Sequence, residues 1–213
     1  MKLVLIGAGG HSKAVRDVIH STEHTIVACL DDCYKELYFK NNMYFGPISA
    51  VKAVLLIHPD AKLVIALEDN GVRKNIMRKL MLSSNSYATI IHQQAVISSS
   101  AKIGQGTVIM PGAVINADAI VGDHVIINTR AVVEHDNVVE DFAHISPGAV
   151  LAGGVGIKQG VHIGANATVL PNILVGEWTT VGAGAVVVTN MPSYVTAVGV
   201  PATVIKTKMV RDI

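Results

Sequence analysis

The chain has 213 residues, of which 50% are hydrophobic and 15% are charged, so it can bury a sizeable core as one large domain or two small ones. The formal net charge is only +1, with no basic stripe, which argues against a nucleic-acid partner. Two cysteines are too few for a disulfide framework, and no apolar stretch has the length of a membrane span. The start shows no cleavage-site pattern, so we expect a cytoplasmic protein.

The first third of the chain reads as the opening of a nucleotide-binding βαβ unit. Residues 2–6 are an unbroken apolar run, typical of a buried parallel strand, and they lead into the glycine turn Gly7-Ala8-Gly9-Gly10-His11-Ser12. A helical pattern follows through Ile19, and a second strand over 25–30 ends in Asp31-Asp32. Glycines let a backbone approach a diphosphate, a helix N-terminus offers free N–H groups, and an acid after the next strand binds a ribose hydroxyl.

This dinucleotide fingerprint is incomplete, because Ser12 stands where a third glycine would fall. We expect the turn to bind a nucleotide diphosphate, and two alternatives stay open: a tight turn without a ligand, and a redox dinucleotide site. Further on, residues 62–67 predict a third strand, and residues 72–82 predict a helix capped by Asp69 or Asn70. We place the end of this first domain at residue 90.

A six-residue repeat occupies the chain from Ala95 to Asn190. Every sixth residue from Ile97 to Val187 is aliphatic, without one break in register, and a mostly small residue lies two positions before each of them. A helix needs a period near 3.6 and a strand a period of 2, so neither explains the pattern. The repeat predicts a parallel β-helix in which three six-residue units close one triangular coil.

Taken together, the glycine turn, Asp31-Asp32, the six-residue repeat and Glu134-His135-Asp136 resemble the hexapeptide-repeat sugar O/N-acyltransferase family. Its members include the bacillosamine-pathway UDP-amino-sugar N-acetyltransferases and the sialic acid O-acetyltransferases. The resemblance implies an α/β, Rossmann-like nucleotide-sugar-binding domain over 1–90, then a left-handed parallel β-helix that binds acetyl-CoA over 91–190. It also implies a C-terminal tail over 191–213 that closes the last coil, and a homotrimer with active sites between subunits.

Acetyl transfer from a thioester needs a base for the incoming amine or hydroxyl and donors for the tetrahedral oxyanion. Imidazole suits the first task because its pKa lies near neutrality, and the carboxylates of Glu134 and Asp136 flank His135. From the residues alone, a surface histidine between two solvated acids is the alternative. The resemblance implies that His135 is the catalytic base and that Asp136 assists it.

The ligand contacts follow the same resemblance. Acetyl-CoA contacts are expected at His144, Gly153, Ala165 and Ala183, with a backbone N–H near Gly153 supporting the oxyanion. For Gly153, Ala165 and Ala183 the alternative is that they are small only because the corners of the coils require small residues. The nucleotide sugar is expected at Gly9, Gly10, His11, Asp31 and Asp32.

His144 and His162 lie eighteen residues apart, which is one coil, and are expected to stack on one face. Metal-dependent hydratases of prism shape need three histidine ligands, two of them close in sequence, and no such pair accompanies these two. We therefore expect no metal, and His162 receives no role. Lys206 or Lys208 is a candidate for a CoA phosphate, with a solvated tail lysine as the alternative.

One departure from the family is Glu68-Asp69, where a glycine and an asparagine are usual. Like charge would repel a diphosphate there, so either these carboxylates point away or the donor sugar differs, and Arg73, one turn into the helix, is a candidate to offset them. Because neither cysteine lies in the repeat, we expect direct transfer of an acetyl group from acetyl-CoA to the amino group of a UDP-activated 4-amino-sugar. Sugar O-acetylation and a non-catalytic trimeric scaffold are the alternatives.

Overall fold

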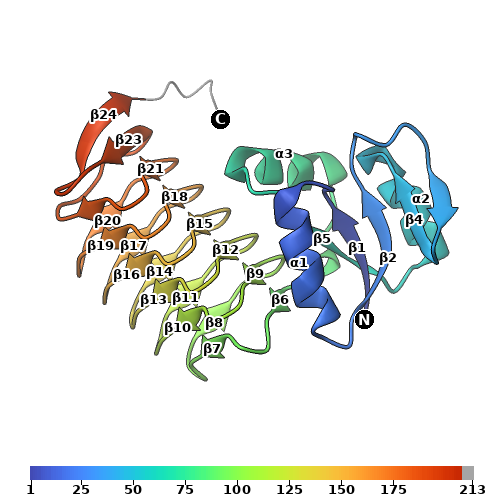
Figure 1. Cartoon of the computed structure of the whole chain (residues 1–213), viewed down its shortest axis with the longest axis horizontal. Coiled ribbons are helices and arrows are strands. Elements are labelled where there is room, and N and C mark those ends of the chain that lie inside the picture. Colours follow the sequence, from blue (N-terminus) through green and yellow to red (C-terminus); the bar gives the residue numbers. More distant parts are fainter. Residues whose placement is uncertain (208–213) are drawn as a thin grey trace.

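The computed structural model describes residues 1–207, and its N-terminal unit is a five-stranded sheet with helices on both faces (Figure 1). The strands are β1 (Lys2–Ile6), β2 (Thr25–Leu30), β3 (Tyr38–Lys40), β4 (Met43–Gly46) and β5 (Lys62–Ile65). The helices are α1 (Gly10–His20), α2 (Val51–Ile57) and α3 (Asn70–Leu80), with single 3-10 turns at η1 (Ile48–Ala50) and η2 (Ser84–Ser86). The strand order is β3-β4-β2-β1-β5, parallel except for the edge strand β3.

Successive side chains of β1 point to opposite faces of the sheet, and both faces are covered by helices. Leu3 and Leu5 pack in one core with α1, whereas Val4 and Ile6 pack in a second core with α2 and α3. A strand buried on both faces reads as a continuous apolar run, which is the pattern that residues 2–6 show. The third expected strand ends at Ile65, two residues earlier than expected, and the expected helix begins at Asn70 with Asp69 as its N-cap.

The six-residue repeat forms a left-handed parallel β-helix, as the resemblance implied. Its three sheets are called faces 1, 2 and 3. Face 1 holds β7 (Val96–Ile97), β10 (Val114–Ile115), β13 (Val132–Val133), β16 (Val150–Leu151), β19 (Thr168–Val169) and β22 (Val186–Val187). Face 2 holds β8 (Lys102–Ile103), β11 (Ile120–Val121), β14 (Val138–Val139), β17 (Gly156–Ile157) and β20 (Leu174–Val175). Face 3 holds β6 (Ile90–Ile91), β9 (Val108–Ile109), β12 (Ile126–Ile127), β15 (His144–Ile145), β18 (His162–Ile163), β21 (Thr180–Val181), β23 (Val195–Val198) and β24 (Thr203–Thr207).

The predicted aliphatic row lies inside this prism. From Ile109 onward every member of the row is buried, and Ile97 and Ile103 in the first coil are partly buried against the same core. Equivalent strands pair in parallel eighteen residues apart, as in the pairing of Ile127 with Ile145. Three six-residue units therefore make one coil, as the period predicted.

The corners of the prism have a period of their own. Every sixth residue from Gly106 to Gly184 is left-handed, with φ between 54° and 70°. Glycine adopts this conformation freely, and asparagine and aspartate tolerate it. The corners form three lines along the prism, called edge 1/2, edge 2/3 and edge 3/1 after the faces that they join.

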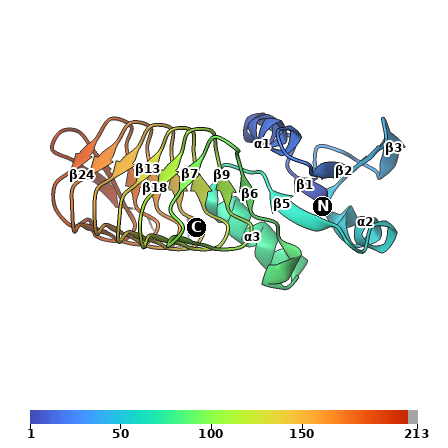
Figure 2. The same ribbon diagram turned by 90° about the horizontal axis from the view of Figure 1, so that it is seen from below.

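The N-terminal unit and the prism share one core. Val15 and Val18 of α1 pack in the same cluster as Ile90 and Val108, which belong to the first strands of face 3. The expected division after residue 90 falls inside β6, whose two residues both pair with β9. Figures 1 and 2 show the unit beside the first coils, with α3 lying along the prism.

Within the described residues, the tail extends face 3 of the prism by two strands. The strand β23 pairs in parallel with β21, and the chain then folds back as β24, which runs antiparallel to β23. Lys206 lies exposed in β24, and Lys208 lies outside the described residues. Within residues 1–207, none of the helices combines the length and the apolar character that crossing a bilayer requires.

Candidate functional site

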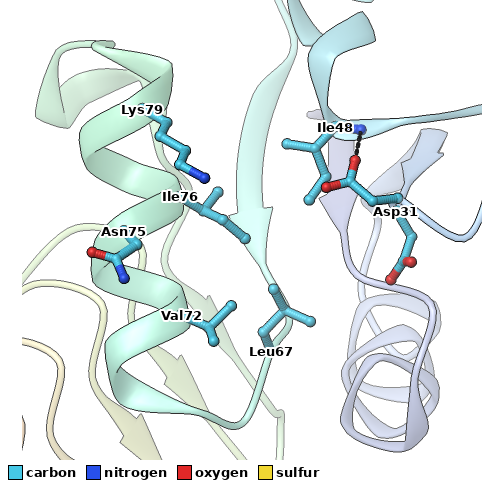
Figure 3. A pocket seen from close by; sticks show the side chains of 8 residues that line it. Asp31, Ile48, Leu67, Val72, Asn75, Ile76 and Lys79 are labelled. Carbon is cyan, nitrogen blue, oxygen red and sulfur yellow. Dashed lines mark hydrogen bonds between the residues drawn. The ribbon is translucent and has the colours of Figure 1, made fainter. Parts of the chain in front are cut away.

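A cavity of about 330 Å³ opens at the carboxyl ends of the parallel strands of the N-terminal unit (Figure 3). Residues from the ends of β2 and β5, from η1 and from α3 line it: Asp31, Asp32, Ile48, Leu67, Val72, Asn75, Ile76 and Lys79. Ligands of open parallel sheets bind outside the carboxyl ends of the strands, where the strand order reverses, and β1 lies at that point here. We call this cavity the nucleotide slot.

The glycines of the turn after β1 differ in the space that surrounds them. Gly7 has φ of 116°, and a Cβ there would lie 2.9 Å from the carbonyl oxygen of Ala66, so the fold itself requires glycine. A Cβ on Gly9 or Gly10 would meet nothing within 4 Å. The open space beside these two glycines, at the start of α1, leaves room for a diphosphate to approach the backbone.

The two aspartates after β2 hold the loops around the slot. Asp31 accepts hydrogen bonds from the backbone N–H groups of Ala8 (2.8 Å) and Cys33 (2.9 Å), and Asp32 accepts one from Ile48 (3.0 Å). Burial raises the pKa of Asp31, but the hydrogen bonds from Cys33 and Ala8 outweigh it, and the net pKa lies below the ordinary value. Asp31 thus anchors the glycine turn, while Asp32 keeps one carboxylate oxygen without a hydrogen bond to the described residues.

Arg73 lies near the two carboxylates that it was expected to offset, but it is buried and forms no ion pair with either among residues 1–207. Asp69 caps α3 by accepting the Val72 N–H at 2.8 Å, and the Glu68 side chain is exposed. Arg73 is only 1% exposed, and its hydrogen bonds go to carbonyl and amide oxygens rather than to these carboxylates. Burial lowers the pKa of Arg73, and the charges of Asp69 and Glu68 raise it, so the guanidinium and the two carboxylates attract one another.

His135 and Asp136 form a pair on edge 1/2 of the prism. The Nδ1 atom of His135 lies 2.8 Å from a carboxylate oxygen of Asp136, and both side chains are mostly exposed. Asp136 occupies a left-handed corner position, with φ of 60°, which turns its side chain back toward the preceding residue. A Cβ on Gly153 would lie 2.6 Å from Cε1 and Nε2 of His135, so the glycine one coil further makes room for the imidazole.

This arrangement suits a general base. The hydrogen bond to Asp136, and then the charges of Asp136 and Glu134, raise the pKa of His135 above its ordinary value. With the Nδ1 proton held by the carboxylate, the Nε2 lone pair is free to accept a proton, a tautomer inferred from the hydrogen bond. The Gly154 N–H donates to the His135 carbonyl, whereas the Gly153 N–H has no acceptor within residues 1–207 and is available to an oxyanion.

His144 and His162 stack on face 3, as expected, with ring centroids 4.8 Å apart. The Nε2 atom of His144 lies 3.0 Å from the Asn128 amide, and that of His162 lies 2.9 Å from the Ser146 hydroxyl. His144 is wholly buried, and this desolvation, with the nearby charges of His162, Arg73 and His11, lowers its pKa to about 2. His144 is therefore a neutral imidazole at the seam between prism and N-terminal unit.

The structure separates the expected site residues into three groups. The nucleotide-sugar candidates lie in the N-terminal unit, with His11 close to His144 of face 3. His135, Asp136 and Gly153 lie on edge 1/2. Ala165 and Ala183 lie on edge 3/1, where Ala165 lines an open groove of about 490 Å³ beside Arg130. One chain alone does not bring these groups together.

Sequence reasoning missed two polar residues of the slot, Asn75 and Lys79. Both lie on the helix face that also carries Val72 and Ile76, a spacing that was available from the sequence. It also missed Asn137, a buried residue whose amide joins the carbonyls of Glu134 and Leu151 and thereby braces the corner below His135. Among residues 1–207, no group of three or more His, Cys, Asp or Glu side chains has a metal-binding arrangement.

Two protein families match parts of this chain. The PglD N-terminal domain family matches residues 2–80, and the bacterial transferase hexapeptide family, six repeats long, matches residues 100–135 and 154–189. A curated relative, UDP-N-acetylbacillosamine N-acetyltransferase of Bacillus subtilis, is 44% identical over 106 residues. That match spans 49% of this chain and 49% of the relative.

Solved structures match over nearly the whole chain. A mutant of perosamine N-acetyltransferase from Caulobacter crescentus, in complex with CoA and GDP-perosamine, is 34% identical with a TM-score of 0.88, covering 97% of both chains. The acetyltransferase domain of PglB from Neisseria gonorrhoeae, in complex with acetyl coenzyme A, is 34% identical with a TM-score of 0.86. That match covers 96% of this chain and 98% of the PglB domain.

The pairing of His135 with Asp136 makes a prediction about titration. In Asp136→Asn the pKa of His135 should fall toward the ordinary histidine value, because the main cause of its increase is the hydrogen bond to the carboxylate. Proton NMR of the imidazole against pH measures the shift. Glu134→Gln is the control and should lower the pKa less, since its charge is the smallest contribution. An unchanged pKa in Asp136→Asn would contradict the pairing.

Proposed function

This chain belongs to the hexapeptide-repeat sugar acyltransferase family, of the bacillosamine-pathway N-acetyltransferase type, and from that membership we propose that it N-acetylates a nucleotide-activated amino sugar. The acceptor is a UDP-linked 4-amino-sugar, and acetyl-CoA is the donor. The observation that carries the proposal is the His135–Asp136 pair above Gly153, on a prism that shares its core with a nucleotide slot.

In the proposed reaction, Nε2 of His135 removes a proton from the sugar amine as its nitrogen attacks the thioester carbonyl. A C–N bond forms, the C–S bond breaks, and the proton passes from the imidazole to the departing CoA sulfur. Asp136 holds the imidazole orientation and stabilises its cationic form. The Gly153 N–H donates to the oxyanion between these steps. No acyl-enzyme is needed, and both cysteines lie outside the prism.

The proposed ligand contacts divide between the two halves of the molecule. Gly9, Gly10 and His11 take the diphosphate at the start of α1, and Asp32 takes a ribose hydroxyl while Asp31 holds the turn in place. Lys79 supplies a cation inside a slot that otherwise carries two carboxylates. On the prism, Ala165 and Ala183 take the pantetheine arm, and the buried His144 supports the thioester end from beneath.

We further propose a homotrimer whose active sites combine residues of two neighbouring subunits. In support, His135 lies on edge 1/2, whereas the nucleotide slot lies beyond face 3 and Ala165 lies on edge 3/1. A closed three-fold ring would bring one edge of each prism against the neighbouring prism. Aliphatic side chains stand in a row on face 2, where Ile120, Val138 and Leu174 are 43–44% exposed, available for burial between subunits.

The first test is CoA release from acetyl-CoA, measured by thiol detection against a panel of acceptors. Release is expected with a UDP-4-amino-4,6-dideoxy sugar, because only an amine at that position matches the proposed attack. A UDP-sugar without a free amine is the matched control. A GDP-linked 4-amino-sugar separates the choice of nucleotide from the choice of sugar. If CoA is released with free sialic acid alone, the reaction is O-acetylation rather than N-acetylation. If no acceptor of the panel leads to CoA release, the proposed catalysis is contradicted.

Replacing the proposed base is the second test. In His135→Ala, kcat should fall by about a hundredfold or more, since general-base catalysis contributes on the order of that factor. The KM values for both substrates should change little, because the proposal places no binding contact on this side chain. His92→Ala, another histidine outside the proposed site, serves as the control. A His135→Ala enzyme with wild-type kcat would rule out this base.

Complementation between subunits tests the shared site. His135→Ala and Asp31→Ala chains should each be nearly inactive at low nucleotide-sugar concentration. Trimers reassembled from an equal mixture should recover about a quarter of wild-type activity, because three-quarters of random trimers contain both chains and each has one intact site of three. Reassembled trimers of either chain alone are the control. No recovery, although mass measurement shows mixed trimers, would mean that each subunit completes its own site.

A further inference from the structure

The seam between the N-terminal unit and the prism depends on a buried arginine without a carboxylate partner. Arg73 is 1% exposed and donates to six oxygen acceptors. Three are main-chain carbonyls of the prism: His124 (3.2 Å), Phe142 (2.8 Å) and Ala143 (3.3 Å). The other three belong to the N-terminal unit: the carbonyls of Leu67 (3.1 Å) and Glu68 (2.7 Å), and the side-chain oxygen of Asn70 (2.8 Å).

The neighbours of Arg73 on α3 extend the same contact along edge 2/3. The Asn70 amide donates to the carbonyls of Gly160 (3.1 Å) and Val161 (3.2 Å), one coil beyond Phe142. Lys74 donates to the side chain of Gln159 at 2.7 Å and lies 4.5 Å from the ring centre of Trp178. The first turns of α3 therefore contact four successive coils.

The same guanidinium also holds the wall of the nucleotide slot. The Leu67 side chain lines the slot, and the Leu67 and Glu68 carbonyls belong to the loop between β5 and α3. A planar guanidinium with five N–H donors can join this loop to two coils at once, whereas a lysine ammonium has three donors. Burial lowers the pKa of Arg73 to about 9, which leaves it protonated at neutral pH.

We infer that Arg73 is a positioning residue, which fixes the nucleotide-sugar site to the prism of its own subunit and, through the packing of prisms in the proposed trimer, relative to the catalytic base of the neighbouring subunit. The inference rests on the proposed function, since it concerns the geometry in which the two substrates meet. Arg73 touches neither substrate and acts through the Leu67–Glu68 loop. Displacement of reacting groups by about 1 Å can lower a rate on the order of a hundredfold, so a loosened seam should reduce turnover while each half-site still binds.

The test compares Arg73→Lys with Arg78→Lys, a replacement at an exposed position of the same helix. In Arg73→Lys, kcat at saturating substrates should fall about ten- to a hundredfold. The dissociation constants of UDP and acetyl-CoA, measured by calorimetry, should stay within about twofold of wild type. Arg78→Lys should change neither. An unchanged kcat, or a loss that appears in the dissociation constants instead, would overturn the positioning role.

A second variant keeps the inference testable if the first does not fold. If Arg73→Lys does not yield folded protein, Asn70→Ala removes two carbonyl contacts and one acceptor of Arg73, and it is judged by the same split between kcat and binding. Amide hydrogen exchange gives a readout independent of activity. It should rise over residues 67–73 in either variant while the prism stays protected, and unchanged exchange there would overturn the inference. If exchange rises in the variants but the wild-type protein has no acetyltransferase activity, the proposed function is contradicted and the contact of Arg73 with the Leu67–Glu68 loop is still supported.

Discussion

A left-handed residue at every sixth position is the constraint on which the whole prism depends. Strands of two residues cannot hold a sheet by themselves, so each coil must turn at fixed points for its backbone to bond with the coils on either side. Glycine, asparagine and aspartate meet this demand at little cost, whereas other side chains pay about 1–2 kcal/mol for the same backbone. On edge 2/3 the costly residues are aromatic, at His124, Phe142 and Trp178. That is the edge along which α3 lies, and the rings of His124 and Phe142 stack there.

The same corner geometry builds the candidate catalytic pair without special strain. Asp136 is left-handed because every corner is, and this conformation brings its carboxylate to Nδ1 of His135. The glycine at 153 follows from the stacking of coils, since any Cβ there would collide with the imidazole of the previous coil. His135, Asp136 and Gly153 lie in two successive coils, and none of them belongs to the inner aliphatic row.

Features that repeat along the chain, or that involve neighbouring residues, could be predicted from the sequence. The six-residue period predicted the prism and its inner row, and the adjacency of His135 and Asp136 predicted their contact. Arg73 was out of reach because most of its partners are main-chain carbonyls, which every residue type carries, so the sequence gives no sign of them. The sequence predicted only the charge interaction of Arg73 with Glu68 and Asp69, and both carboxylates do raise its pKa. The burial of His144 likewise arises only when the N-terminal unit covers face 3.

His135 and His144 of the prism lie in opposite electrostatic environments. His135 lies exposed beside a carboxylate that raises its pKa, whereas His144 is desolvated and close to the Arg73 cation, which helps to lower its pKa to about 2. Titratable groups whose pKa values are pushed apart in this way serve different roles in a site. The imidazole at the seam is neutral and can take part only in hydrogen bonds, whereas the imidazole on the edge is the one suited to take up a proton in the proposed reaction. Burial is the main cause of the low pKa of His144, and Arg73, which we infer to position the slot, adds to it, so one buried cation acts on both the geometry and the electrostatics of the seam.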